Sequence, residues 1–117
     1  PLRLSNGRGE YKMANLKISE TKLDLNQKNL SIQLKVKAYY NEFITLQNQL
    51  ELQTGNFNNY KMLQTAEETR FFNGESSMFL VNSRENKTLD AYKKLIEIKT
   101  KLAKTAYALQ YSAGILQ

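Results

Sequence analysis

Hydrophobic residues recur along the first half of the chain at alternating spacings of three and four positions. This register runs from Ile18 to Phe71, and most of its positions are apolar. Its members are Ile18, Lys22, Leu25, Asn29, Ile32, Val36, Tyr39, Phe43, Leu46, Leu50, Gln53, Phe57, Tyr60, Gln64, Glu67 and Phe71. Because the spacing averages about 3.5 residues, it predicts a helix with a coiled-coil seam. Polar members gather toward residue 71, so we expect the seam to weaken there.

The second half of the chain repeats the pattern over a shorter stretch. Its register consists of Ala91, Leu95, Ile98, Leu102, Thr105, Leu109 and Ser112. The chain has a single proline, Pro1, and the stretch 10–72 contains one glycine, Gly55, which we interpret as a tolerated surface residue. With so few helix breakers, the sequence predicts two long helices, at about 10–72 and about 76–113.

The segment between the two helices must reverse the chain. Asn73 and Gly74 tolerate positive φ where a helix ends, and Ser76 or Ser77 can cap the next helix. We expect a flexible entry at residues 5–9 and an end of the second helix at Gly114. The predicted fold is all-α: one domain, residues 1–117, forming a long antiparallel two-helix coiled-coil hairpin with its turn at 73–75.

Each helix also carries apolar residues outside its seam, so each has two sides to cover. In the first helix these are Leu16, Leu23, Leu30 and Leu34, and in the second they are Leu89, Tyr92, Ile96, Ala103 and Ala106. The helices would be ~93 Å and ~57 Å long. The second would cover the first only back to about residue 34, which leaves residues 10–33 projecting. We therefore expect the chain to self-associate or to pack on segments outside it, and its start at Pro1 suggests a piece of a longer protein.

Composition excludes several kinds of chemistry. The chain lacks His and Cys, which supply most transition-metal ligands and nucleophile–base pairs, so we expect no enzyme activity, no metal site and no cofactor. Glu67 and Glu68 are interpreted as part of a solvated face. The net charge is +6, but the basic residues are spread singly, so nucleic-acid binding is the weakest interpretation. No apolar run approaches the length of a membrane span.

The turn and its flanks resemble a known family. The pattern aromatic-x-x-Gly-Glu-Ser-Ser-x-Phe-Leu-x-Asn-Ser-Arg-Glu begins at Phe71 and ends at Glu85. It follows a Tyr-rich helix, precedes a Lys/Ala/Leu-rich one ending in Ala-Gly-x-Leu, and resembles outer-membrane efflux proteins of the TolC type, in a Bacteroidetes-like version. The opening Pro1-Leu2-Arg3-Leu4, with Arg8 and Gly9, is similar to the point where the family's outer-membrane strand passes into a long periplasmic helix.

The resemblance implies a function and a set of partners. Family members are homotrimers that join an outer-membrane β-barrel to a periplasmic α-helical barrel, so this chain would be one periplasmic hairpin in the tunnel wall. Membrane contact would come only through strands missing here. The tip would dock a periplasmic adaptor, which in turn works with an inner-membrane pump. The implied tip residues are Phe71, Asn73, Gly74, Glu75, Ser76, Ser77, Met78 and Phe79.

One departure from the family limits what can be carried over. Some relatives have Tyr at the position of Phe71 and Gly-Thr-Arg-Thr where this chain has Gly74-Glu75-Ser76-Ser77. Because Ser76 replaces the arginine, the tyrosine- and arginine-based gate of those relatives is not implied here. A free-standing coiled-coil scaffold or protein-interaction module stays open as the alternative function.

Overall fold

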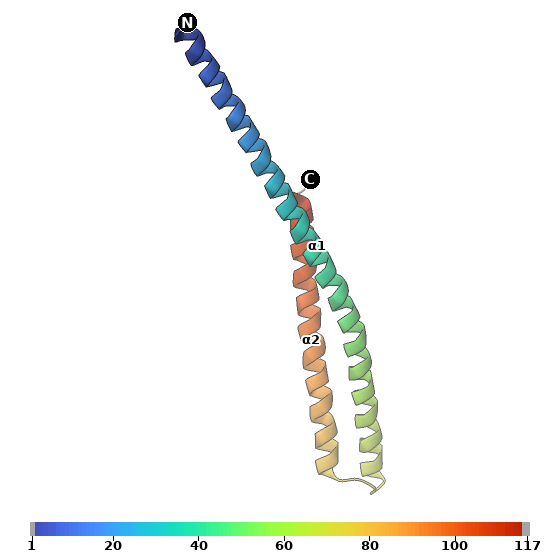
Figure 1. The fold of residues 1–117 in the computed structure, drawn as a ribbon. Helices are drawn as coiled ribbons and strands as arrows, with labels where there is room; N and C mark the ends of the chain where they lie inside the picture. Colours follow the sequence, from blue (N-terminus) through green and yellow to red (C-terminus); the bar gives the residue numbers. More distant parts are fainter. Residues whose placement is uncertain (1, 116–117) are drawn as a thin grey trace.

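The chain folds into two long helices that form a narrow rod (Figure 1). The computed structural model describes residues 2–115, with side chains described for 4–114. Helix α1 spans Leu2–Phe72 and helix α2 spans Met78–Ile115, and the rod measures 108 × 20 × 14 Å. The predicted all-α helical hairpin is thus confirmed. Pro1 and Leu116, which belong to the family-like segments, lie outside the described residues.

The two helices pack along the seam that the sequence predicts. From Ile32 to Glu67 the members of the first register are shielded from solvent, apart from Tyr60, which is 38% exposed. On α2 the whole register from Ala91 to Ser112 is shielded. The seam also extends toward the turn through Val81 and Thr88, which are both buried. The 3-4 spacing therefore identified the packed face of each helix.

Few apolar side chains along this seam are fully buried. The buried apolar residues are Leu46, Val81, Ala91 and Leu95, and the buried polar ones are Glu67, Thr88, Thr105 and Ser112. Some polar groups bond across the seam: Gln53 Nε2 donates to Ala91 O at 3.0 Å, and Thr88 Oγ1 lies 3.2 Å from Tyr60 O. A hydrogen bond across the seam contributes less net stability than packed apolar side chains at the same positions would. We therefore expect the hairpin to have only moderate stability.

The expectation of a flexible entry at residues 5–9 is wrong. Helix α1 begins at Leu2, about eight residues before the predicted start, and includes both Gly7 and Gly9. Glycine weakens a helix without forbidding it, and no proline interrupts this stretch. Leu4 and Tyr11 also continue the seam register backward from Ile18, so the periodic pattern starts earlier than the glycines suggested.

The boundaries of the second helix also differ from the prediction. Helix α2 begins at Met78 rather than 76, because Ser77 acts as the cap and a capping residue lies outside the helix it caps. At its other end α2 continues through Gly114 to Ile115, so Gly114 does not end it. Gly55 lies within α1 with no atom of another group within 4 Å of where a Cβ would stand, as a surface glycine would.

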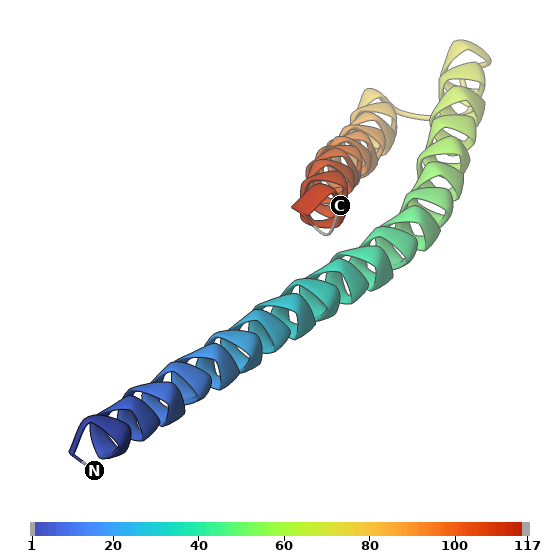
Figure 2. The ribbon, with the colours of Figure 1, turned by 90° about the horizontal axis from the view of Figure 1, so that it is seen from above.

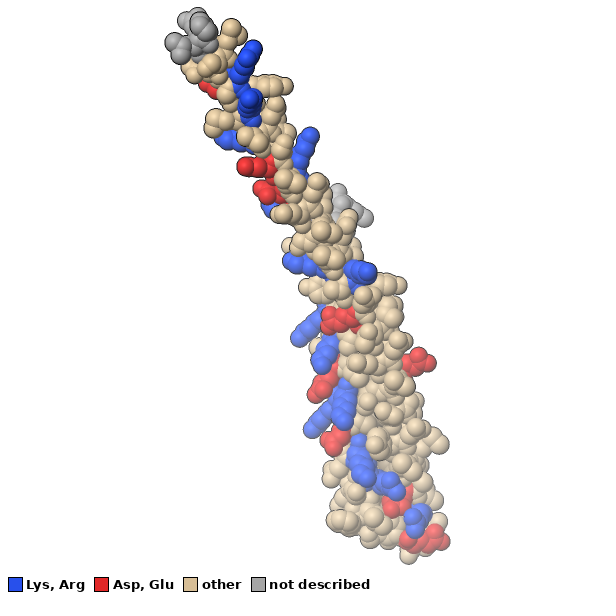
Figure 3. Space-filling model, in the orientation of Figure 1, with Lys and Arg blue, Asp and Glu red and all other residues tan. Residues whose placement is uncertain are grey.

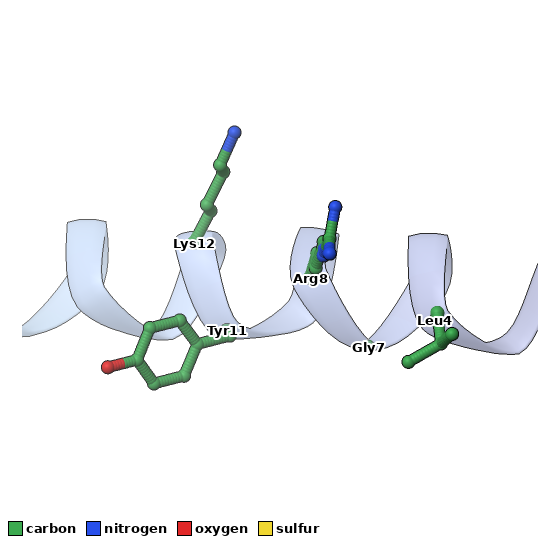
Figure 4. A pocket seen from close by; sticks show the side chains of 5 residues that line it. All are labelled: Leu4, Gly7, Arg8, Tyr11 and Lys12. Atoms are coloured by element: carbon green, nitrogen blue, oxygen red, sulfur yellow. The ribbon is translucent and has the colours of Figure 1, made fainter.

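The first part of α1 extends past the end of α2. Residues 4–31 are all exposed, and Figure 2 shows this part of α1 running far beyond the carboxyl end of α2. We call residues 2–31 the overhang. Figure 4 shows its first turns, where Leu4 and Tyr11 lie on one side of the helix and Arg8 and Lys12 on the other. With Gly7 between them they line an open hollow, so the seam continues here without a partner helix. Neither described helix is long and apolar enough to span a membrane.

Candidate functional site

Helix α1 ends in a hydrogen-bonded turn that only a few residue types can form. Gly74 has a φ of 77°, in the left-handed region that favours glycine. The Gly74 N–H donates to Phe71 O at 3.0 Å, and the Glu75 N–H donates to Arg70 O at 2.8 Å. These two bonds are those of a Schellman motif with Gly74 at the position after the C-cap. The expectation of a positive φ at residues 73–74 is confirmed for Gly74.

Arg70 fastens this turn to the last turn of α1. Its guanidinium donates from Nη2 to Glu75 O at 3.2 Å and from Nη1 to Glu67 Oε2 at 3.3 Å. The Glu67 side chain is almost completely buried, whereas that of Arg70 is about half exposed. Arg70 therefore compensates a buried carboxylate and holds the chain beyond the helix at the same time. Sequence reasoning missed this role, because it requires the turn geometry to be known.

The two serines of the turn have different environments. Ser77 Oγ accepts a hydrogen bond from the Leu80 N–H at 3.3 Å, which makes Ser77 the N-cap of α2. Ser76 Oγ is buried and has no hydrogen-bond partner. The sequence analysis left open which serine caps the helix, and the structure assigns the role to Ser77. The Ser76 hydroxyl is thus enclosed by the turn, whereas Ser77 is exposed and its hydroxyl caps the helix.

The surface of the tip is formed by large apolar side chains. Phe72 is 85% exposed, Phe79 is 79% exposed and Met78 is 57% exposed, while Phe71 and Leu80 are partly covered. The rings of Phe71 and Phe72 lie edge to face with centroids 6.1 Å apart. We call Phe71, Phe72, Met78, Phe79 and Leu80 the tip cluster. Exposed apolar groups gathered in this way are typical of a protein-contact surface.

The sequence analysis included Phe71, Met78 and Phe79 of this cluster but omitted Phe72 and Leu80. Phe71 belongs to the seam register and was included, whereas Phe72 lies one position off it. A large apolar residue off the seam and beside a turn cannot be packed by the partner helix, and that signal was available in the sequence. Of the predicted tip residues, Phe71 ends α1 with Phe72, residues 73–77 form the turn, and Met78 and Phe79 open α2.

Charged side chains lie along the body of the rod, in contrast to the apolar cluster at its tip. Figure 3 shows Lys and Arg side chains interleaved with Asp and Glu along one edge of the visible face, beside a broad area without charge. Interleaved charges of both signs produce no extended basic surface on this face. The visible charge pattern therefore fits a solvated edge better than a nucleic-acid groove.

The comparisons with known proteins identify no relative. No protein-family model, no curated protein and no solved structure matches this chain. The resemblance of residues 71–85 to the TolC-type family therefore stays a hypothesis based on the motif itself.

Proposed function

We propose that this chain serves as the periplasmic coiled-coil hairpin of an outer-membrane efflux channel of the TolC type. In this role it forms part of the tunnel wall of a homotrimer and docks a periplasmic adaptor at its tip, while the adaptor engages an inner-membrane pump. The channel would sit in the outer membrane and this segment in the periplasm. The strands that contact the membrane would belong to parts of the protein outside this segment.

The observation that carries the proposal is the tip cluster on its fixed turn. Phe72 and Phe79 are among the most exposed apolar residues of the described chain, and they lie on the two sides of one hydrogen-bonded turn. Aromatic side chains held on a rigid support contribute strongly to binding, because little conformational entropy is lost when they are buried. A partner that meets the end of the rod would therefore find a preformed apolar contact surface.

The sides of the rod support the second part of the proposal, the tunnel wall. Leu89 and Ile96 are exposed on the side of α2 outside the seam, and Leu52 and Met62 are exposed on α1. A hairpin standing alone in water gains nothing from apolar residues at these positions. Neighbouring helices on both sides, as in a helical barrel, would cover them.

The test removes the aromatic rings of the tip in the full-length channel. We expect Phe72→Ser and Phe79→Ser, combined, to lower both efflux and adaptor cross-linking at least about tenfold, because two central apolar contacts are lost. The yield of trimer in the outer membrane should hold, since neither ring lies in the seam. Tyr107→Ser is the matched control: it removes an aromatic side chain that is 74% exposed and lies far from the tip. Unchanged efflux and cross-linking in the double variant would refute adaptor docking at the tip.

Ser76 is a poor position for this experiment. Its Oγ is buried within the turn, so a bulky residue there would deform the tip as well as alter its surface. Loss of efflux in Ser76→Arg would not separate a docking defect from a misshapen turn. The exposed rings of Phe72 and Phe79 avoid this ambiguity.

The alternative, a free-standing coiled-coil scaffold, is favoured by one observation. Exposed apolar residues run along the whole rod and are not confined to the tip. A scaffold would bind its partners along its sides, so Phe72→Ser with Phe79→Ser would leave those partners bound. The tip variant therefore discriminates between the two functions.

A further inference from the structure

We propose that the overhang dimerises with the overhang of a second copy of this chain, in antiparallel orientation. The contact surface is the leucine stripe, which we define as Leu16, Leu23, Leu30 and Leu34. This inference concerns the 117-residue chain in solution and does not rest on the proposed function.

The leucine stripe is an unpartnered coiled-coil seam. Its side chains are between 57% and 64% exposed. With Glu20 and Gln27 between them they follow spacings of four and three, the pattern of the seam that packs on α2. By helical geometry the stripe lies on nearly the opposite side of α1 from that seam. A second helix can therefore pack on it without disturbing the hairpin.

The overhang needs such a partner more than any other part of the chain. It extends for roughly 30 residues with no neighbouring helix, and most of the stability of a helix in a protein comes from packing of its apolar face. Two glycines, Gly7 and Gly9, weaken it further. Where the overhang meets the hairpin, an open hollow is lined by Gln27, Leu30, Ser31, Leu34, Lys35 and Ala38, and the first four have the spacing of a hole that receives a knob from a facing helix.

Glu20 opposes a parallel pairing of the stripe. It occupies an inner position of the stripe, and in a parallel dimer it would face Glu20 of the second copy. Two like charges brought together at the centre of an interface are unfavourable. In an antiparallel dimer Glu20 instead lies beside Leu23 of the second copy, and Gln27 lies beside Leu16.

Charges beside the stripe favour that same antiparallel register. Lys17 directly follows Leu16, and Asp24 directly follows Leu23, so both flank the stripe on one side. In this register Lys17 comes nearly level with Asp24 of the second copy. The twofold symmetry of the dimer repeats the pair, which gives two opposite-charge contacts. On the other flank Ser19 comes nearly level with Asn26 of the second copy, and neither is charged.

The second copy fits this surface better than another segment of the same chain. The α2 helix covers α1 only back to about Ile32, so it cannot reach Leu16, Leu23 and Leu30, and Leu34 stays 59% exposed because it lies on another face of α1. In the antiparallel register about 26 residues overlap, from 9 to 34, or about 39 Å. This length nearly matches the overhang, so each hairpin projects from one end of the paired region and the two do not collide.

Sedimentation of the 117-residue chain over a range of concentrations is the first test. We expect a monomer–dimer equilibrium, with a dissociation constant raised at least about tenfold by Leu23→Glu, because two leucines leave each dimer and each new carboxylate lies beside Glu20 of the other copy. Leu52→Glu is the matched control, since it adds the same charge at an exposed leucine outside the overlap. Circular dichroism should show the hairpin retained in both variants.

The orientation is tested by charge exchange and by cross-linking. Lys17→Glu and Asp24→Lys should each weaken the dimer, and the two together should restore it, because they recreate both opposite-charge pairs. The chain has no cysteine, so Ser19→Cys and Asn26→Cys chains can be mixed and joined with a short bismaleimide. Cross-links should form between the two variants and not between two copies of one variant.

Three outcomes would overturn the proposal. One is a monomer at every concentration up to the high micromolar range. Another is efficient cross-linking of Ser19→Cys chains to one another, which indicates a parallel pair. The third is a dimer that survives Leu23→Glu but is lost with Phe79→Ser, which places the contact at the tip. Since these measurements use only the isolated chain, a negative result leaves the efflux experiment unaffected, and the reverse also holds.

Discussion

Arg70 donates a hydrogen bond to the main-chain oxygen of Glu75, 3.2 Å away, across the end of α1. The same guanidinium pairs with Glu67, whose side chain is buried in the seam. One residue thus joins two parts of the tip: the packed face of α1 and the Schellman turn. The tip cluster flanks this turn, so we expect its rigidity to depend on Arg70.

Removing Arg70 should therefore destabilise the hairpin. In Arg70→Ala the buried Glu67 carboxylate loses its paired cation, and the main-chain oxygen of Glu75 loses its hydrogen bond from the guanidinium. We therefore expect the free energy of unfolding to fall by about 1–2 kcal/mol. Urea denaturation followed by circular dichroism measures it. Lys61→Ala removes the same charge from an exposed position of α1 and should change stability by less than about 0.5 kcal/mol. Equal losses in the two variants would mean that the change in net charge, and not the loss of the contacts of Arg70 with Glu67 and Glu75, lowers the stability.

Two glycines of the same chain should respond to alanine in opposite directions. Gly74 has a φ of 77°, which an L side chain adopts only with strain, so Gly74→Ala should cost about 1 kcal/mol. Gly55 is helical and has open space where a Cβ would stand, so Gly55→Ala should gain about 0.5–1 kcal/mol. Thermal melts of the two variants and the parent chain provide the comparison. A gain at both positions would contradict the left-handed conformation of Gly74.

The packed faces could be predicted from sequence because a heptad register repeats the same information many times. A single polar member such as Gln53 or Glu67 does not erase a pattern that Leu46 and Leu50 reinforce nearby. The prediction also extended to what the seam leaves uncovered, since the overhang follows from the unequal helix lengths. Regular periodicity thus determined the architecture and the exposed leucine stripe.

The details of the tip could not be read in this way, because they depend on single contacts. The sequence allows either Ser76 or Ser77 to cap α2, and only the geometry of the turn shows that Ser77 accepts from the Leu80 N–H. The start of α1 was misjudged for a related reason. Gly7 and Gly9 are compatible both with a loop and with a helix of modest stability, so composition alone does not decide between them.

The serines of the turn offer a matched pair for testing the cap. Ser77→Ala removes the acceptor for the Leu80 N–H and should cost about 1 kcal/mol. Ser76→Ala removes a buried hydroxyl that has no partner, so it should be neutral or stabilise the hairpin slightly. Both substitutions delete one oxygen from adjacent residues, which makes the difference between them informative. If Ser76→Ala were the more costly of the two, the assignment of the cap would be reversed.

The division between the packed and open faces of α1 can be tested with two leucines only six positions apart. Leu46 is 6% exposed in the seam, whereas Leu52 is 71% exposed on the opposite side. Leu46→Ala opens a cavity between the helices and should cost about 2–3 kcal/mol, while Leu52→Ala should change the free energy of unfolding by less than about 0.5 kcal/mol. Measurements at low micromolar concentration keep self-association from masking the comparison. A loss at Leu52 as large as that at Leu46 would show that a neighbouring helix already covers the outer face of the isolated hairpin. A small loss there leaves the outer face free for partners that the assembled protein would supply.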